Sequence, residues 1–191
     1  MRTRRASVVA SLTIVVAAAH GDALANDPDF SRLRGPYLGQ AAPGTTPQVF
    51  APGVVSTDAE EGSCAFSSDG RRFWFVRRRS PSGNGILETE MVDGAWTPPR
   101  LAPFSVGAPD WDFVLAPDGR SMYISSSRPV TEGGALQENY RIWRSEELDA
   151  SWSPPLLLPP VVNSGAHDSF PSVAQDGTLY FFSRRAGGLG D

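Results

Sequence analysis

The sequence contains no lysine, one cysteine and two histidines among its 191 residues. All 17 basic residues are therefore arginine, which we attribute to genome composition rather than to mechanism. Because Cys64 is the only cysteine, no intrachain disulfide can form, and the folded chain must be held together by packing. On a predicted strand, Cys64 is interpreted as a small buried hydrophobe and not as a nucleophile.

The scarcity of histidine also limits catalysis and metal binding. Beyond the first 25 residues His167 is the only histidine. A serine-type catalytic triad would have to use it, but the sequence has no Gly-x-Ser-x-Gly nucleophile elbow. As a metal ligand, His167 has no companion His or Cys at ligand spacing. The sequence therefore predicts no metal site, no cofactor and no catalytic residue.

Residues 1–25 have the pattern of a secretory signal peptide. Arg2, Arg4 and Arg5 precede an apolar run over residues 6–19, and Ala23-Leu24-Ala25 provides a small-residue cleavage site. A membrane anchor is the alternative, but a run of ~14 residues is shorter than the ~20 that span a bilayer. We expect a mature chain that begins at Asn26, is periplasmic or secreted, and has no membrane span.

The charge of the mature chain argues against nucleic acid as a partner. Three of the 17 arginines and one of the 21 acidic residues lie in the signal segment, leaving 14 basic and 20 acidic residues and a formal charge of −6. Phosphate binding needs a clustered basic surface, which this balance does not favour. From Asn26 to residue 47, Pro, Gly and polar residues predict an irregular N-terminal leader.

An internal repeat is the most informative feature of the chain. Asp-Gly pairs occur at Asp69-Gly70, Asp118-Gly119 and Asp176-Gly177, spaced 49 and 58 residues apart, each between two short apolar runs. Glycine accepts the positive φ of a tight turn, and the aspartate bonds the nearby backbone. Each pair therefore predicts a β-hairpin, and the period is near that of one propeller blade.

Further strands complete each unit. Residues 86–91 and 140–145 alternate in polarity, and each is followed by a Trp-x-Pro-Pro segment, at 96–99 and 152–155, that predicts a solvent-facing edge strand. Four strands make one propeller blade. We therefore predict an all-β fold: a partial β-propeller of two and a half to three four-stranded blades, interpreted as a C-terminally truncated fragment. The expected parts are an outer closing strand at 48–56, blades at 60–101 and 109–158, and an incomplete blade at 166–191.

The repeat resembles the TolB-type, WD40-like propeller repeat over residues 60–185. The best match is Ala116-Pro117-Asp118-Gly119 followed by residues 122–125, while Ser68 and Gln175 stand where the family usually has proline. The leader at residues 35–40 also looks like the start of exported bacterial proteins that carry this repeat. The resemblance implies a six- or seven-bladed ring that binds a partner in the cell envelope, often another protein, and does not imply an enzyme.

An acidic residue lies eight positions before each turn aspartate. These residues are Glu61, Asp110 and Asp168. They could form a ring at one end of a central channel and, with His167 nearby, bind a cation or a basic ligand group. Alternatively, each acid caps the loop that leads into its own blade by accepting backbone N–H bonds.

The aromatic residues and the function also have more than one interpretation. Trp74, Trp111 and Trp143 could stack on sugars or pack between blades. We expect a non-catalytic module that binds a protein, carbohydrate or small ligand. The alternatives are a polysaccharide-active hydrolase or lyase that uses the three repeated carboxylates, and a structural envelope component. Apolar faces on the terminal blades predict self-association.

Overall fold

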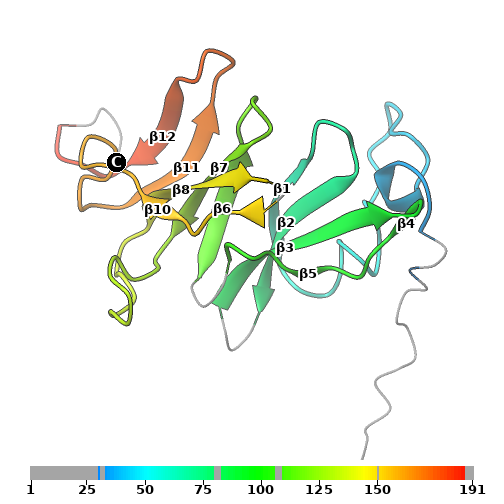
Figure 1. The fold of residues 1–191 in the computed structure, drawn as a ribbon, viewed down its shortest axis with the longest axis horizontal. Helices are drawn as coiled ribbons and strands as arrows, with labels where there is room; N and C mark the ends of the chain where they lie inside the picture. The colour runs from blue at the N-terminus through cyan, green and yellow to red at the C-terminus, as the bar shows by residue number, and fades with distance from the viewer. Residues whose placement is uncertain (1–29, 31–32, 80–82, 106–108, 150, 188–191) are drawn as a thin grey trace, which may run out of the picture.

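A computed structural model describes residue 30 and residues 33–79, 83–105, 109–149 and 151–187 (Figure 1). The expected signal peptide, residues 1–25, lies outside these ranges. The described chain forms three antiparallel sheets, which confirms the prediction of an all-β fold. None of its described helices is long and apolar enough to cross a membrane.

The first sheet contains the first Asp-Gly hairpin. Its strands run in the order β1-β2-β3-β4, and β5 also pairs with β3. β2 and β3 are the longest pair and stay in register over eight residues. The strands are β1 (Glu61–Phe66), β2 (Arg72–Arg79), β3 (Gly83–Val92), β4 (Ala95–Trp96) and β5 (Arg100–Leu101).

The second sheet repeats this arrangement. Its order is β10-β8-β7-β6, with β9 also paired to β8, so again two short strands flank a Pro-Pro segment beside the third long strand. The strands are β6 (Asp110–Leu115), β7 (Ser121–Ser126), β8 (Arg141–Leu148), β9 (Ser151–Trp152) and β10 (Leu156–Leu157). The third sheet is the hairpin of β11 (Asp168–Val173) and β12 (Leu179–Ser183).

Each Asp-Gly pair lies at the turn between the first two strands of its sheet. Gly70, Gly119 and Gly177 have φ of 68°, 67° and 85°, and each donates its N–H to the carbonyl three residues earlier. A side chain is disfavoured at such φ, so glycine relieves the turn of strain. Asp118 Oδ1 accepts the Arg120 N–H at 2.7 Å, and the other two turn aspartates make the equivalent bond.

The sheets follow one another with their first strands adjacent: β1 contacts β6, and β6 contacts β11 (Figure 1). An apolar cluster fills the space between the first two sheets and includes Trp74, Val76, Phe113, Met122 and Ile124. An ion pair of 2.6 Å between Arg72 of β2 and Glu147 of β8 joins the same two sheets.

The N-terminal segment covers the other face of the first sheet. Here a 3₁₀ helix, η2 (Tyr37–Gly39), places Leu38 in a cluster with Phe73, Phe75 and Trp96. The Trp96 indole donates to the Gly35 carbonyl at 2.8 Å. Trp96 is only 2% exposed, so the prediction of a solvent-facing Trp-x-Pro-Pro segment was wrong for this residue. The reason is that the leader packs over it.

Two further expectations need correction. Residues 48–56 form turns and a single bridge between Pro52 and Ser56 instead of a strand, with Val54 and Val55 buried. Cys64 lies on β1 as expected but is exposed, not buried. Within the described part of the chain, β1 pairs only with β2, and the cluster under the leader does not extend over this side chain.

Candidate functional site

The three repeated carboxylates occupy equivalent places in the fold. Glu61, Asp110 and Asp168 are the first residues of β1, β6 and β11. Since these strands lie next to one another, the acids begin neighbouring strands, as the sequence predicted. Their side chains, however, do not converge on one open site. Each is held in a local network that we call the carboxylate–arginine clamp.

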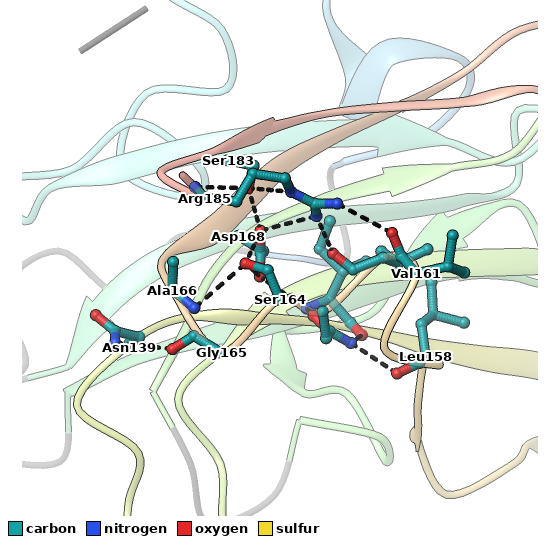
Figure 2. A network of polar contacts seen from close by, with 12 residues as sticks. Asn139, Leu158, Val161, Ser164, Gly165, Ala166, Asp168, Ser183 and Arg185 are labelled. Atoms are coloured by element: carbon teal, nitrogen blue, oxygen red, sulfur yellow. Dashed lines mark hydrogen bonds and ion pairs between the residues drawn. The ribbon is translucent and has the colours of Figure 1, made fainter. Parts of the chain in front are cut away.

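The clamp of the third sheet is drawn in Figure 2. Asp168 accepts hydrogen bonds from the Ser164 N–H at 2.8 Å and from the Ser183 hydroxyl at 2.5 Å. Arg185 forms an ion pair with the same carboxylate at 3.2 Å. The guanidinium also donates to the carbonyls of Val161 and Val162, so it joins the carboxylate to the loop that leads into the sheet.

The second sheet has the same clamp. Asp110 accepts from the Ser105 hydroxyl at 2.5 Å and pairs with Arg128 at 2.6 Å, and Arg128 donates to the Phe104 carbonyl at 3.2 Å. In both sheets the arginine also donates its Nε–H to a serine hydroxyl two residues earlier, Ser126 or Ser183.

In the first sheet glutamate replaces aspartate. Glu61 accepts the Thr57 hydroxyl at 2.6 Å and pairs with Arg77 at 2.9 Å. Arg77 in turn donates to the carbonyls of Val54 and Val55 at 2.8 and 3.1 Å. The carbonyls of residues 54 and 55 thus accept hydrogen bonds from the arginine in the first sheet, as those of residues 161 and 162 do in the third.

These contacts favour the loop-capping interpretation of the three acids. Asp110 and Asp168 are fully buried. Burial raises the pKa of Asp168, but hydrogen bonds from Ser183, Ser164 and Arg185 outweigh it and hold the pKa below its usual range. An ionised carboxylate whose lone pairs are occupied stabilises its loop and has little capacity left for a ligand.

His167 packs among aromatic rings. Its ring lies edge-on to Tyr140 at 5.1 Å and to Phe182 at 6.3 Å. Burial and the neighbouring Arg184 lower its pKa, while Asp168 acts in the opposite direction, so the imidazole is neutral at pH 7. Its backbone carbonyl accepts the Arg184 N–H, which makes His167 part of the β11–β12 pairing.

A pocket of about 260 Å³ lies where β1, β6 and β11 begin. We call it the first-strand pocket. Glu61 is the only one of the three repeated acids that lines it, and its carboxylate is already paired with Arg77. The other lining residues that matter here are Glu60, Ser63, Arg78, Trp111, Asp112 and Phe170.

Irregularities in the strands shape this pocket. The register of each first strand shifts near its start, between residues 61 and 64, 110 and 112, and 169 and 172. Such bulges re-aim side chains and are frequent beside functional sites. At the third of them Phe170 has a φ of 50°, donates its N–H to the Ser125 hydroxyl, and leaves its ring 54% exposed.

Asp112 differs from the clamped acids. It is 8% exposed and accepts a hydrogen bond from the Ser63 hydroxyl of the neighbouring sheet. Burial raises its pKa, and hydrogen bonds from Ser63 and the Phe113 N–H offset this only in part. Among the arginines whose side chains the structure describes, none forms an ion pair with Asp112, so these residues leave its charge uncompensated.

Sequence reasoning identified one of the pocket's exposed aromatic residues and missed the other. Of the three tryptophans considered for ligand stacking, Trp74 and Trp143 are buried, and Trp111 is 42% exposed and lines the pocket. Phe170 and Asp112 carried no signal of their own, because a bulge is not visible in the sequence. Asp112 is two residues beyond the repeated acid, at a position occupied by Ser63 and Phe170 in the other units.

Across the described ranges, no three His, Cys, Asp or Glu side chains gather in a way that could hold a metal ion. Comparisons with family models, with curated proteins and with solved structures find no match to this chain.

Proposed function

We propose that the three sheets are successive blades of a β-propeller arc. Three features support this proposal. The first two sheets share one strand order, the first strands lie side by side, and all three units carry the same clamp. Stacking of equivalent units so that each buries the face of its neighbour is the mechanism by which repeat folds form a continuous core.

We further propose that the chain is an exported module that binds a partner in the cell envelope without catalysis. Export is supported by the signal pattern at residues 1–25. Binding is supported chiefly by the first-strand pocket, in which two exposed aromatic side chains and an uncompensated carboxylate surround a cavity.

The geometry is less favourable to the alternative of a polysaccharide-active enzyme. Paired-carboxylate hydrolysis needs two carboxyl groups that face one substrate and differ in protonation. Asp110 and Asp168 do not line the pocket, and each is bound by an arginine. Among the described lining residues, Glu60, Glu61 and Asp112 carry carboxylates, and Glu60 and Glu61 are each paired with an arginine. Asp112 alone does not supply the pair of carboxyl groups that this hydrolysis needs.

The experiment is a screen of glycans and peptides with the purified chain, in which binding and product release are both measured. We expect binding without turnover. Trp111→Ala should weaken the binding about tenfold or more, because exposed aromatic anchors dominate such sites. The matched control is Tyr180→Ala, which removes an exposed aromatic side chain outside the pocket. Product release by the wild-type chain, or equal effects of the two substitutions, would contradict the proposal.

The export proposal has its own measurement. Expression of the full chain in a bacterial host should give a periplasmic or secreted product whose N-terminus is Asn26, as read by mass spectrometry. A product that remains in the cytoplasm with residues 1–25 attached would contradict it.

A further inference from the structure

The charges around the first-strand pocket do not cancel. Glu60 pairs with Arg78 at 2.8 Å, and Glu61 pairs with Arg77 at 2.9 Å. Asp112 is left with a neutral partner, the Ser63 hydroxyl. A carboxylate that is 8% exposed loses most of its hydration, and a hydroxyl does not replace the missing opposite charge. The described residues at the wall of the pocket therefore carry a net negative charge.

Aromatic faces lie beside this charge. Trp111 directly precedes Asp112 on β6, and its ring is braced by Tyr140 at 6.1 Å. Phe170 reaches the same cavity from β11 and is braced by Phe182 at 6.3 Å. Aromatic rings attract cations through their faces, most strongly when the cation is partly removed from water.

We propose that the first-strand pocket binds an alkylammonium group, with Asp112 as the counter-ion and Trp111 and Phe170 as the aromatic wall. This proposal rests on the proposed function, since it assumes that the pocket is the binding site. The volume of about 260 Å³ lies slightly below the range of pockets for drug-sized ligands, roughly 300–1,000 Å³. The occupant is therefore one cationic headgroup or one side chain.

A cation suits this site better than a neutral sugar. A sugar would stack on Trp111 and donate hydroxyl groups to Asp112, but the buried charge would stay uncompensated. An alkylammonium ion supplies the opposite charge, and its methyl or methylene groups contact the rings. The group could belong to a quaternary headgroup or to a lysine-like primary amine, and both present the same chemistry to the pocket.

Calorimetric titration at constant ionic strength tests the proposal. The probes are choline, n-butylammonium, glucose, and 3,3-dimethylbutan-1-ol, which has the shape of choline without its charge. We expect at least one of the cations to bind, and to bind about tenfold or more tightly than the neutral alcohol. The tighter of choline and n-butylammonium identifies the source of the group as a quaternary headgroup or a primary amine.

Substitutions locate the binding. Asp112→Asn keeps an acceptor for Ser63 and removes the charge, so it should weaken binding of the cation about tenfold or more and leave the weak binding of the alcohol unchanged. Glu132→Gln is the control, because it removes an exposed carboxylate from a loop outside the pocket. It should leave the affinity unchanged.

The outcomes separate this proposal from the proposed function. Equal binding of choline and its neutral analogue, or an Asp112→Asn chain that binds the cation normally, overturns the ammonium assignment. Glucose binding that is lost in Trp111→Ala also overturns it but supports the module. If no probe binds and Trp111→Ala is silent in the glycan and peptide screen, both proposals fail.

Discussion

The first and third sheets place the same strand pattern in opposite surroundings. Pairing with the first strand aligns Glu61 with Arg77 and Asp168 with Ser183, so Trp74 and Val76 of β2 correspond to Tyr180 and Phe182 of β12. Trp74 and Val76 are 0% and 4% exposed beneath the second sheet, whereas Tyr180 and Phe182 are 62% and 38% exposed. The same positions are thus core in one sheet and surface in the other. What decides is whether a neighbouring sheet lies against them.

Truncation of the aromatic side chain at Trp74 and at Tyr180 should give the largest difference in the free energy of unfolding between the two sheets. Trp74→Ala removes a buried side chain from the cluster between the first two sheets and should lower the free energy of unfolding by about 3–5 kcal/mol. Tyr180→Ala should change it by about 0.5 kcal/mol or less, because the side chain is exposed. Urea denaturation measures both. Similar losses at the two positions would show that β12 is covered in solution.

The clamps of the second and third sheets should also differ in how much they stabilise the fold. Arg128 is 11% exposed, and its removal leaves Asp110 buried without a counter-ion, so Arg128→Gln should destabilise the chain by about 3 kcal/mol. Arg185 is 34% exposed, and Asp168 keeps its bonds from Ser164 and Ser183, so Arg185→Gln should have a smaller effect, about 1–2 kcal/mol. The measurement is again urea denaturation, and the reverse order would contradict the account.

The open face of β12 should also control association. Apolar side chains that are exposed together mark interaction surfaces, so we expect the purified chain to self-associate through this face. The double variant Tyr180→Ser, Phe182→Ser should weaken the association about tenfold or more, as measured by sedimentation. The control is Leu136→Ser, which changes an exposed apolar residue elsewhere. If the control weakens association equally, the face is not responsible.

Acid should destabilise the fold in part by protonating Asp168 in the clamp of the third sheet. The folded-state pKa of Asp168 lies below its unfolded value, so the carboxylate stabilises the fold above the unfolded pKa. That contribution is lost as the pH falls below about 4 and through the folded pKa. Melting temperatures measured from neutral pH downward should therefore fall less in Asp168→Asn than in wild type. Parallel curves would show that Asp168 does not contribute to acid unfolding.

Local sequence signals predicted the hairpins because each signal is carried by neighbouring residues. Asp118-Gly119 alone specifies a turn with positive φ at glycine, and the apolar runs on both sides specify the strands. The acids at equivalent strand starts followed from the same alignment. The particular contacts of each acid did not, since Arg185 reaches Asp168 and the Val161 carbonyl only after the strands pair.

Long-range packing and strand irregularities lay beyond the sequence. The leader could not be predicted to bury Trp96, because the Gly35 carbonyl that accepts its indole N–H is 61 residues away. The pocket depended on a bulge that turns Phe170 outward, and nothing in the local pattern specifies it. Asp112 was missed because it differs from the three repeated acids in having no ion pair with an arginine among the described residues, and the sequence does not show which acids are paired.

The reactivity of one engineered thiol at each of the two equivalent positions measures whether the second sheet covers β2 in solution while β12 stays open. In a Cys64→Ser background, Val76→Cys and Phe182→Cys place single cysteines on β2 and β12, and alkylation rates are measured under native conditions and normalised to those of the unfolded chains. Phe182→Cys should react at least about tenfold faster, because Val76 is 4% exposed and borders only the wall of the first-strand pocket, whereas Phe182 is 38% exposed on the open face of β12. Equal normalised rates would contradict the account.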